Sequence, residues 1–495
     1  MRGLPVTGRK PRLSFVVLLA VVTGTSVTAA RPTPAVPANP DDRTILHVLN
    51  RIGFGARPGD VERVRQLGLQ AYIDQQLHPE RIPDTAATSR LSGLETLGRS
   101  PRELAAEYFA PAIRARREAK AAAGDASPEE KPMRTPEQMA AAQKRREVLE
   151  DLNAQKILRA IYSDRQLEEV MTDFWFNHFN VFAGKGATAI YLTEYERDVI
   201  RPHVLGKFRD LLGATAKSPA MLFYLDNWQS AAANTPTVRA ALRRGEKTQA
   251  RGLNENYGRE LMELHTLGVD GGYTQQDVIE VARCFTGWTI RQPRRGGGFA
   301  FDPRLHDTGK KLVLGHVIAH GGERDGEEVL DILASHPSTA RFISTKLARR
   351  FVSDDPPPSL VERAAARFRE TDGDIREVVR TIITSPEFFA AAANRAKVKT
   401  PFEFVVSAVR SMGGDVHNAM PLAQAIRQLG EPLYLCQPPT GYADRAGAWV
   451  NTGTLLNRMN FAVAFAGGRL RGVEPGADAG VAAALSLGSP EFQRR

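Results

Sequence analysis

The sequence predicts a mainly α-helical protein of two packed helical units, with one small β-hairpin near residues 298–315. Apolar residues recur three or four positions apart over most of the chain, and capping residues and glycines bound these stretches. Strict alternation of apolar and polar residues, which is typical of strands, is convincing only between residues 298 and 315. A chain of 495 residues is long enough for two units, which we place at residues 43–335 and 336–495.

The first 30 residues have the pattern of a secretory signal peptide. A basic segment precedes the apolar run 13–22, and small residues at 27–30 follow, so cleavage is expected after Ala30. An uncleaved anchor is the alternative, but a run of about ten apolar residues is shorter than the roughly 20 that span a bilayer. Residues 31–42 hold four prolines and are interpreted as an extended tether. The mature chain is therefore expected in the periplasm or secreted, without a stable membrane span.

The charge balance does not indicate a nucleic-acid partner. Loss of the signal segment removes four basic residues and no acidic one, which lowers the formal charge from +10 to +6. The sequence has no strip of lysine and arginine with interleaved aromatic residues, and no zinc-finger spacing. We therefore predict no nucleic-acid binding.

Helical segments follow one another along the first unit. After a turn at 53–60 we expect two short helices at 61–67 and 69–77. Residues 114–136 are charged, rich in alanine and broken by proline, and are interpreted as a surface insertion. A long helix over residues 137–162 follows, with a continuous apolar stripe.

The stretch 170–182 places five aromatic residues around Asn177 and His178. It is either a buried helix whose polar pair is satisfied internally, or the wall of an apolar pocket with Asn177 and His178 as convergent polar groups. Histidine suits acid–base chemistry and metal ligation. No HxxxH or HExxH partner accompanies His178, so no metal site is predicted.

Between this stretch and residue 252 the chain is polar and charged. Residues 191–212 are interpreted mostly as the solvated face of a helix, because charges lie three and four positions apart. A short helix then ends at Asp226. The basic loop at 229–252 is either a lid over a site or an inert surface loop.

The densest group of ionisable side chains lies at residues 252–288, GLNENYGRELMELHTLGVDGGYTQQDVIEVARCFTGW. Asn254 is placed to cap a helix over 255–267, which Gly268 ends. Thr274 and Asp277 form the pattern of a capping box that opens a second helix over 275–285. Folding alone explains these features.

One helix face in this stretch is left unexplained by folding. Asn256, Glu260 and Glu263 share that face with Arg259 beside them, and two glutamates at this spacing suit an acid of raised pKa or a cation ligand. His265 lies about 140° around the helix from Glu260, which argues against a metal site on this helix alone. The catalytic candidates are Glu260, Glu263, His178 and His265, and the binding candidates are Asn177, Asp226, Asn254, Asn256, Arg259, Trp288, His306 and Asp307.

The predicted hairpin has Phe299 and Phe301 on one arm and residues 311–314 on the other, with a turn at 307–309. His306 and Asp307 at that turn are either functional or part of an Asx turn with an exposed histidine.

Helices are then expected at 327–334, 339–352, 360–369, 374–385, 419–429 and 454–466. The rigid loop 437–442 precedes Trp449, which packs either over a pocket or over the core. The two cysteines, Cys284 and Cys436, are either bridged or two buried thiols on separate helices.

Several stretches resemble the bacterial family called domain of unknown function 1800. They include FWFNHFNVF, the whole of residues 252–288, LHDTGKK and LGSPEFQRR, and the resemblance extends from Asp42 to Arg495. The resemblance implies an exported protein, possessing no assigned activity, cofactor or catalytic residues. It also suggests a sulfatase-like exported partner encoded nearby. Cys436 departs from the family pattern, so a bridge to Cys284 is not implied for the family.

Two functions fit these observations. The first is an extracytoplasmic binding or assembly protein with a polar pocket near residues 252–288. The alternative is an extracytoplasmic hydrolase that acts on an envelope or extracellular polymer, using Glu260 or Glu263 with His178 or His265. We favour the first because the sequence has no nucleophile elbow, no HExxH and no phosphate loop.

Overall fold

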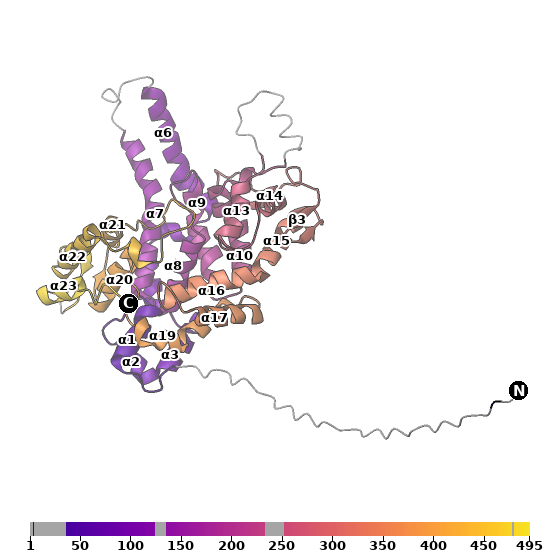
Figure 1. The fold of residues 1–495 in the computed structure, drawn as a ribbon. Coiled ribbons are helices and arrows are strands. Elements are labelled where there is room, and N and C mark those ends of the chain that lie inside the picture. The colour runs from indigo at the N-terminus through magenta and orange to yellow at the C-terminus, as the bar shows by residue number, and fades with distance from the viewer. Residues whose placement is uncertain (1–2, 4–35, 124–134, 233–251, 478–479) are drawn as a thin grey trace. The chain divides into compact units, whose positions relative to one another are not determined.

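Helices make up most of the regular structure in the computed structural model, which describes residue 3 and residues 36–123, 135–232, 252–477 and 480–495 (Figure 1). The predicted fold class is confirmed: the described chain is mainly helical, with three small two-stranded sheets. Residues Ala35–Arg495 group into one unit. Both expected units, 43–335 and 336–495, contribute to a single large hydrophobic core within it.

The helices before residue 233 are α1 (Asp42–Arg51), α2 (Asp60–Leu67), α3 (Leu69–Gln76), α4 (Thr85–Leu91), α5 (Pro101–Glu103), α6 (Ala110–Ala123), α7 (Pro136–Tyr162), α8 (Gln166–His178), α9 (Thr188–Glu194), α10 (Phe208–Lys217) and α11 (Pro219–Tyr224). Those after residue 252 are α13 (Glu255–Glu263), α14 (Gln275–Cys284), α15 (Glu323–Ser335), α16 (Pro337–Phe351), α17 (Pro358–Glu370), α18 (Ile375–Ile383), α19 (Pro386–Phe389), α20 (Pro401–Ser411), α21 (Met420–Gln428), α22 (Thr452–Ala466) and α23 (Val481–Gly488).

The expected starts of the two helices in residues 252–288 agree with the capping chemistry. Thr274 accepts a hydrogen bond from the backbone N–H of Asp277, whose side chain returns the bond, so the predicted capping box opens α14. Asn254 caps α13 as predicted. That helix ends at Glu263, earlier than expected, because the backbone N–H groups of His265 and Leu267 reach back five residues rather than four.

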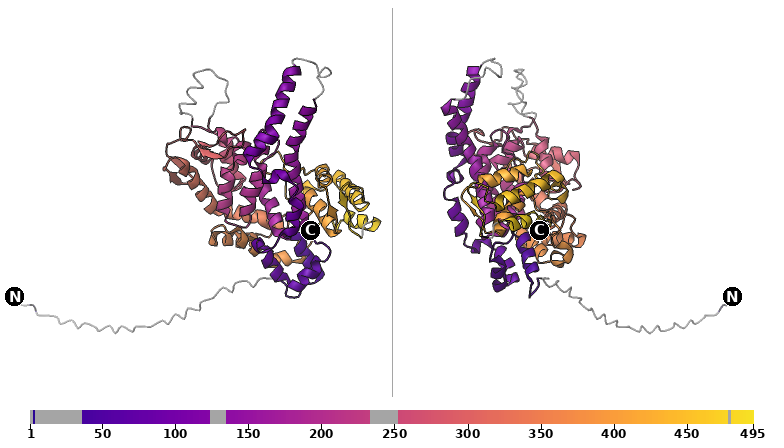
Figure 2. Two further views of the ribbon diagram at one scale, coloured as in Figure 1. Left: turned by 180° about the vertical axis from the view of Figure 1, so that it is seen from behind. Right: turned by 90° about the vertical axis from the view of Figure 1, so that its left-hand side faces the viewer.

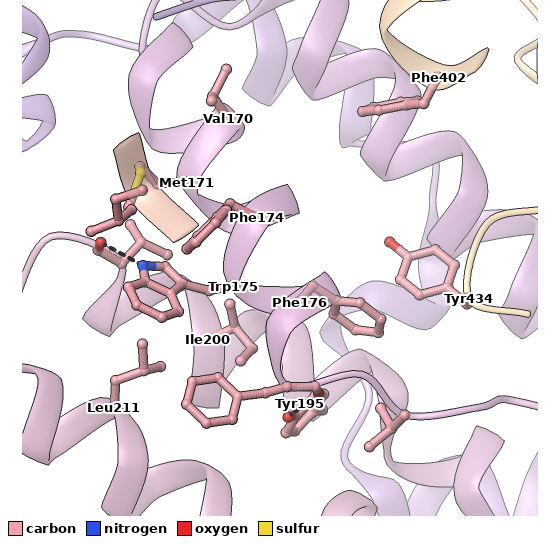
Figure 3. Packing of buried hydrophobic residues seen from close by; sticks show 14 of the residues in the cluster. Val170, Met171, Phe174, Trp175, Phe176, Tyr195, Ile200, Leu211, Phe402 and Tyr434 are labelled. Atoms are coloured by element: carbon pink, nitrogen blue, oxygen red, sulfur yellow. Dashed lines mark hydrogen bonds between the residues drawn. The ribbon is translucent and has the colours of Figure 1, made fainter. Parts of the chain in front are cut away.

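Helix α8 carries the aromatic stretch through the core (Figure 3). Trp175 is fully buried and donates its Nε1–H to the carbonyl of Val204 at 3.0 Å. Phe176 packs edge-on against Tyr434, with ring centres 5.0 Å apart. The left view of Figure 2 shows the long helix α7 running beside α6, and α7 also packs against α20 and α21 from the C-terminal half.

The strands pair differently from the predicted hairpin. β2 (Phe299–Phe301) pairs with β1 (Trp288–Ile290), and β3 (Lys311–Val313) pairs with β4 (His316–Ile318), so the two expected arms belong to different sheets. The third sheet joins β5 (Asp415–Val416) and β6 (Val473–Glu474). Leu314 and Gly315 both have positive φ, 48° and 82°, which matches the tight two-residue turn that closes β3 onto β4. Three-residue strands are too short to show alternation in the sequence.

Residues 191–212 are not one solvated helix. The chain passes from α9 through a π-helical turn (Tyr195–Ile200) and a 3₁₀ turn (Arg201–His203) before α10. Glu196 is only 1% exposed and accepts hydrogen bonds from Gln155 and Tyr434. Arg201 makes a bidentate ion pair with Glu169 at 2.7 and 3.0 Å. These partners come from other elements, which charge spacing along one helix does not reveal.

The two cysteines are not bridged. Both are free and buried, Cys284 in α14 and Cys436 in the loop after α21, so only the first lies on a helix as expected. Burial raises the pKa of Cys284 to about 12 and that of Cys436 to about 11. Both thiols are therefore protonated and unreactive near neutral pH.

Two expectations fall on residues that the structure leaves undescribed. Most of the basic loop, residues 233–251, and the part of the insertion at 124–134 lie outside the described residues, while 114–123 continue α6. In the described part of the chain, no helix has both the length and the apolar character that crossing a membrane requires.

Candidate functional site

The site residues predicted from the sequence lie in several places. Asn177 and His178 line a cavity between α8, α16 and the loop after α21. Asp226 has a left-handed backbone and accepts from Lys185 Nζ at 2.6 Å. Asn254 caps α13 and donates to the Leu225 carbonyl. Trp288 is fully buried in the core.

The polar face of α13 is tied to neighbouring residues by local hydrogen bonds. Glu263 accepts from the Tyr273 hydroxyl at 3.1 Å, and Arg259 donates to Gln275 at 2.7 Å. Asn256 is exposed. Burial, followed by the charge of Glu263, raises the pKa of Glu260. None of these side chains lines the cavity beside His178, and the described residues contain no group of three or more acidic, histidine or cysteine side chains placed to hold a metal ion.

His306 and Asp307 are held in place by residues from two helices. Asp307 forms the expected Asx turn to Gly309 and also pairs with Arg283. The Asx-turn interpretation expected an exposed His306, but His306 is buried, with 5% of its surface exposed. Its Nε2 lies 3.1 Å from Asp325 Oδ2. Asp325 enters from α15, so the turn sequence alone does not show the burial.

A cavity of about 290 Å³ lies beside His178. The loop 436–442 forms part of its wall, and two asparagines of the aromatic stretch hold this loop in place by hydrogen bonds. Asn177 both accepts from the backbone N–H of Tyr442 at 2.7 Å and donates to its carbonyl at 2.8 Å. Asn180 donates to the carbonyls of Cys436 and Pro438. The polar residues of this stretch therefore build the cavity rather than act as isolated core groups.

The close approach of the loop 436–442 to α8 requires a glycine. Gly441 has φ +71°, and a β-carbon there would lie 2.2 Å from the backbone oxygen of Asn177. Behind the loop, Trp449 is 6% exposed and also lines the cavity, with its ring centre 6.0 Å from that of Tyr442.

His178 forms a pair with Lys346 of α16. Lys346 Nζ lies 2.8 Å from His178 Nδ1, and His178 Nε2 lies 3.1 Å from the His265 carbonyl. Because a carbonyl only accepts, Nε2 carries the ring hydrogen and Nδ1 accepts from the lysine ammonium. Burial, and then the charge of Lys346, lowers the pKa of His178 well below its ordinary value. His178 is therefore a neutral acceptor, and residues 252–288 contribute the carbonyl that orients it.

Lys346 is a partly buried cation that faces the cavity. Burial lowers its pKa to about 8. Throughout the described residues, no carboxylate lies within ion-pair distance of its Nζ; Asp444, which favours its charge from farther away, pairs with Lys397 at 2.7 Å. An ammonium whose hydrogen-bond partner is a neutral ring retains the capacity to bind an anion.

Acidic groups also line the cavity. Asp173 pairs with Lys156 at 2.7 Å. Glu431 accepts from the backbone N–H of Phe402, and burial, followed by the charge of Asp173, raises its pKa to about 8. Glu431 is therefore mostly protonated at neutral pH and contributes a polar group without full negative charge.

Sequence reasoning identified Asn177 and His178 but not Lys346 or Glu431. Lys346 lies in an ordinary amphipathic helix and Glu431 follows another, so neither has a local motif. The sequence signals for this cavity were the aromatic residues around His178 and the prolines of the loop 436–442.

The family model described as "Protein of unknown function (DUF1800)" matches residues 47–494. This range includes every residue that lines the cavity. Searches of curated proteins and of solved structures find no match to the chain.

Proposed function

The chain belongs to the DUF1800 family, whose description assigns no activity, and we propose that it is an exported binding protein that holds an anionic ligand group at Lys346. The observation that carries the proposal is the Lys346–His178 pair, with Nζ 2.8 Å from Nδ1 at the wall of a cavity of about 290 Å³. This cavity differs from the pocket expected near residues 252–288: no described residue of that stretch lines it, and the stretch is linked to it by the His265 carbonyl beside His178.

Desolvation makes this lysine a favourable anion site. Removing an ammonium from water without a counter-charge destabilises the folded protein, as the lowered pKa of Lys346 indicates. A carboxylate, sulfate or phosphate group in the cavity would supply that counter-charge and a charge-assisted hydrogen bond. His178 holds the ammonium in position but, being neutral, does not cancel its charge.

The size and lining of the cavity restrict the ligand. Its volume of about 290 Å³ is at the lower end for small-molecule sites. Its lining includes the aromatic rings of Tyr442 and Trp449 and the protonated Glu431. We therefore propose a small polar molecule, or the end of a larger one, that carries one anionic group.

Replacement of Lys346 tests the proposal. Calorimetric titration with inorganic sulfate and with glucuronate at pH 7 is expected to show binding to the wild type and a loss of about 10- to 100-fold in affinity for Lys346→Met, since a hydrogen bond to a charged group contributes about 1.5–3 kcal/mol. Wild-type affinity is expected to fall as pH rises through about 8, where Lys346 loses its proton.

Lys310 offers a matched control, because it is exposed and lies outside the cavity. Lys310→Met should bind both probes as the wild type does. The proposal is wrong if neither probe binds the wild type, if Lys346→Met binds as tightly as Lys310→Met, or if affinity is constant between pH 7 and 9.

Export is supported by the order of basic, apolar and small residues in the first 30 positions. Expression of the full chain in a bacterial host, followed by cell fractionation and N-terminal sequencing, is expected to recover a periplasmic or secreted protein that begins at Arg31. A sulfatase-like exported partner would be sought in the same fraction by co-purification. Recovery of the uncleaved chain from the cytoplasm would contradict the export proposal.

A further inference from the structure

A second cavity, of about 400 Å³, lies between α1, α20 and the C-terminal residues. Both Lys399, just before α20, and Ser407, within it, line this cavity, and their side chains are deeply buried at 3% and 2% residue exposure. Lys399 Nζ lies 2.7 Å from Ser407 Oγ. The Lys346–His178 pair plays no part in this cavity, so the inference below is independent of the proposed function.

The surroundings of Lys399 favour its neutral form. Burial lowers its pKa to about 7; Glu403 opposes this effect, and the nearby Arg495 and Arg458 add to it. The Nζ atom also lies 3.7 Å from the centre of the Phe492 ring. Among the described residues, no carboxylate lies within ion-pair distance of Nζ, so close to neutral pH a substantial fraction of this amine can accept a proton.

Two other buried groups at this cavity lack hydrogen-bond partners. Arg495 is 4% exposed, and its Nη2 has no partner among the described residues although its Nε pairs with Glu403. His47 is 7% exposed; its Nε2 bonds to the Phe388 carbonyl, and its Nδ1 has no partner in that same set of residues. Buried polar groups are rarely left unpaired, so these two lining residues retain unused hydrogen-bonding capacity.

We propose that Ser407 and Lys399 form a nucleophile–base pair that hydrolyses a carboxylic ester in this second cavity. A serine hydroxyl is a weak nucleophile until an adjacent base takes its proton. An amine at hydrogen-bond distance is one of the known arrangements that supplies such a base, in place of histidine. Arg43, Arg395 and Arg494 also line the cavity, and Glu491 is the one acidic residue among the lining residues that the structure describes, so the ester is expected to carry an anionic group.

The reaction balances with these groups alone. The neutral Lys399 amine takes the Ser407 proton as Oγ bonds to the acyl carbon, and the positive charge of Arg495, which lines the cavity, favours the oxygen that becomes negative. The ester C–O bond then breaks, and the Lys399 ammonium gives its proton to the leaving alcohol. Water attacks the acyl-serine while Lys399 takes its proton; the acid departs, and Ser407 recovers its hydroxyl proton from Lys399.

Covalent labelling of the mature chain with a fluorophosphonate probe tests this inference, with the adduct located by peptide mass spectrometry. We expect one adduct, on Ser407, and a labelling rate that rises with pH through about 7 as Lys399 becomes neutral. Lys399→Met is expected to label at least about 10²-fold more slowly than the wild type, because it lacks the base. Ser407→Ala should not label.

Ser411 provides a matched control, since it lies one helical turn later in α20 and lines the same cavity. Ser411→Ala and Lys310→Met should both label at the wild-type rate, since Lys310 is exposed and lies outside both cavities, and circular dichroism establishes that each variant is folded. The inference is overturned if folded wild type forms no adduct on Ser407, or if Lys399→Met in its folded state labels as fast as the wild type. Hydrolysis of p-nitrophenyl acetate should follow the same order among the variants.

Discussion

Glu403→Gln is expected to lower the free energy of unfolding by about 3–5 kcal/mol, because it leaves buried arginines without their counter-charge. Glu403 is 3% exposed, forms an ion pair with Arg350 and accepts from Arg495 Nε at 3.0 Å. Thr400 adds a backbone N–H to the same carboxylate. The glutamine keeps the shape and removes the charge, and urea denaturation at pH 7 measures the loss.

The pH dependence of this effect has a definite sign. Burial alone would raise the pKa of Glu403, but Arg350 and Arg495 outweigh it and lower the pKa to about 2, from an ordinary value of 4.5. The stabilisation is therefore complete above about pH 4.5 and is lost as pH falls towards 2. The difference between wild type and Glu403→Gln should shrink over that interval.

An exposed ion pair provides the control for this prediction. Arg341 and Glu362 lie 2.7 Å apart, with side chains 65% and 52% exposed. Glu362→Gln should change the free energy of unfolding by less than about 1 kcal/mol. If Glu403→Gln were no more destabilising than Glu362→Gln, the buried cluster would not be stabilising the fold.

Lys346→Met is expected to raise the free energy of unfolding by about 1–2 kcal/mol at pH 7 while it weakens anion binding. The fall of the Lys346 pKa from 10.5 to about 8 corresponds to a cost of at most about 3 kcal/mol, and the hydrogen bond to His178 returns about 1 kcal/mol. Since folding lowers this pKa, the cost is complete below pH 8 and disappears as pH rises towards 10.5. Thermal and urea unfolding of both proteins at pH 7 and 9.5 measure this.

Lys397 is the matched comparison, as a buried lysine that has its counter-charges. It pairs with Asp354 at 2.6 Å and Asp444 at 2.7 Å. Lys397→Met should therefore be destabilising where Lys346→Met is stabilising. Destabilisation of similar size in both variants would mean that Lys346 serves the fold rather than a ligand.

Local patterns predicted the helices well. α14 begins at the capping box that the residue spacing predicted, and the expected long helix at 137–162 matches α7, Pro136–Tyr162, closely. The strand pairing was wrong because Trp288–Ile290 is too short to show alternation. The charges at 191–212 were misplaced because Glu169 and Tyr434, their partners, lie on other elements.

The candidate site was only partly visible in the sequence for the same reason. Asn177 and His178 stood out because aromatic residues surround them, and both line the cavity. Lys346 is 168 residues away from His178 along the chain, and nothing near it in sequence distinguishes it from a surface lysine. Its significance depends on burial without a carboxylate partner, which is a property of the folded chain.

Proton uptake on binding tests the central claim, that Lys346 binds an anion, most directly. Calorimetric titration of the wild type with glucuronate at pH 8, in two buffers of different ionisation enthalpy, gives the number of protons taken up. At its pKa of about 8 Lys346 is half protonated, so tight ion pairing should draw up to about half a proton per ligand at this residue. Glu431 in the same cavity has a similar pKa, so the uptake that remains in Lys346→Met measures its share, and the wild type should take up clearly more. Binding without proton uptake, or the same uptake per ligand in Lys346→Met as in the wild type, would contradict the claim.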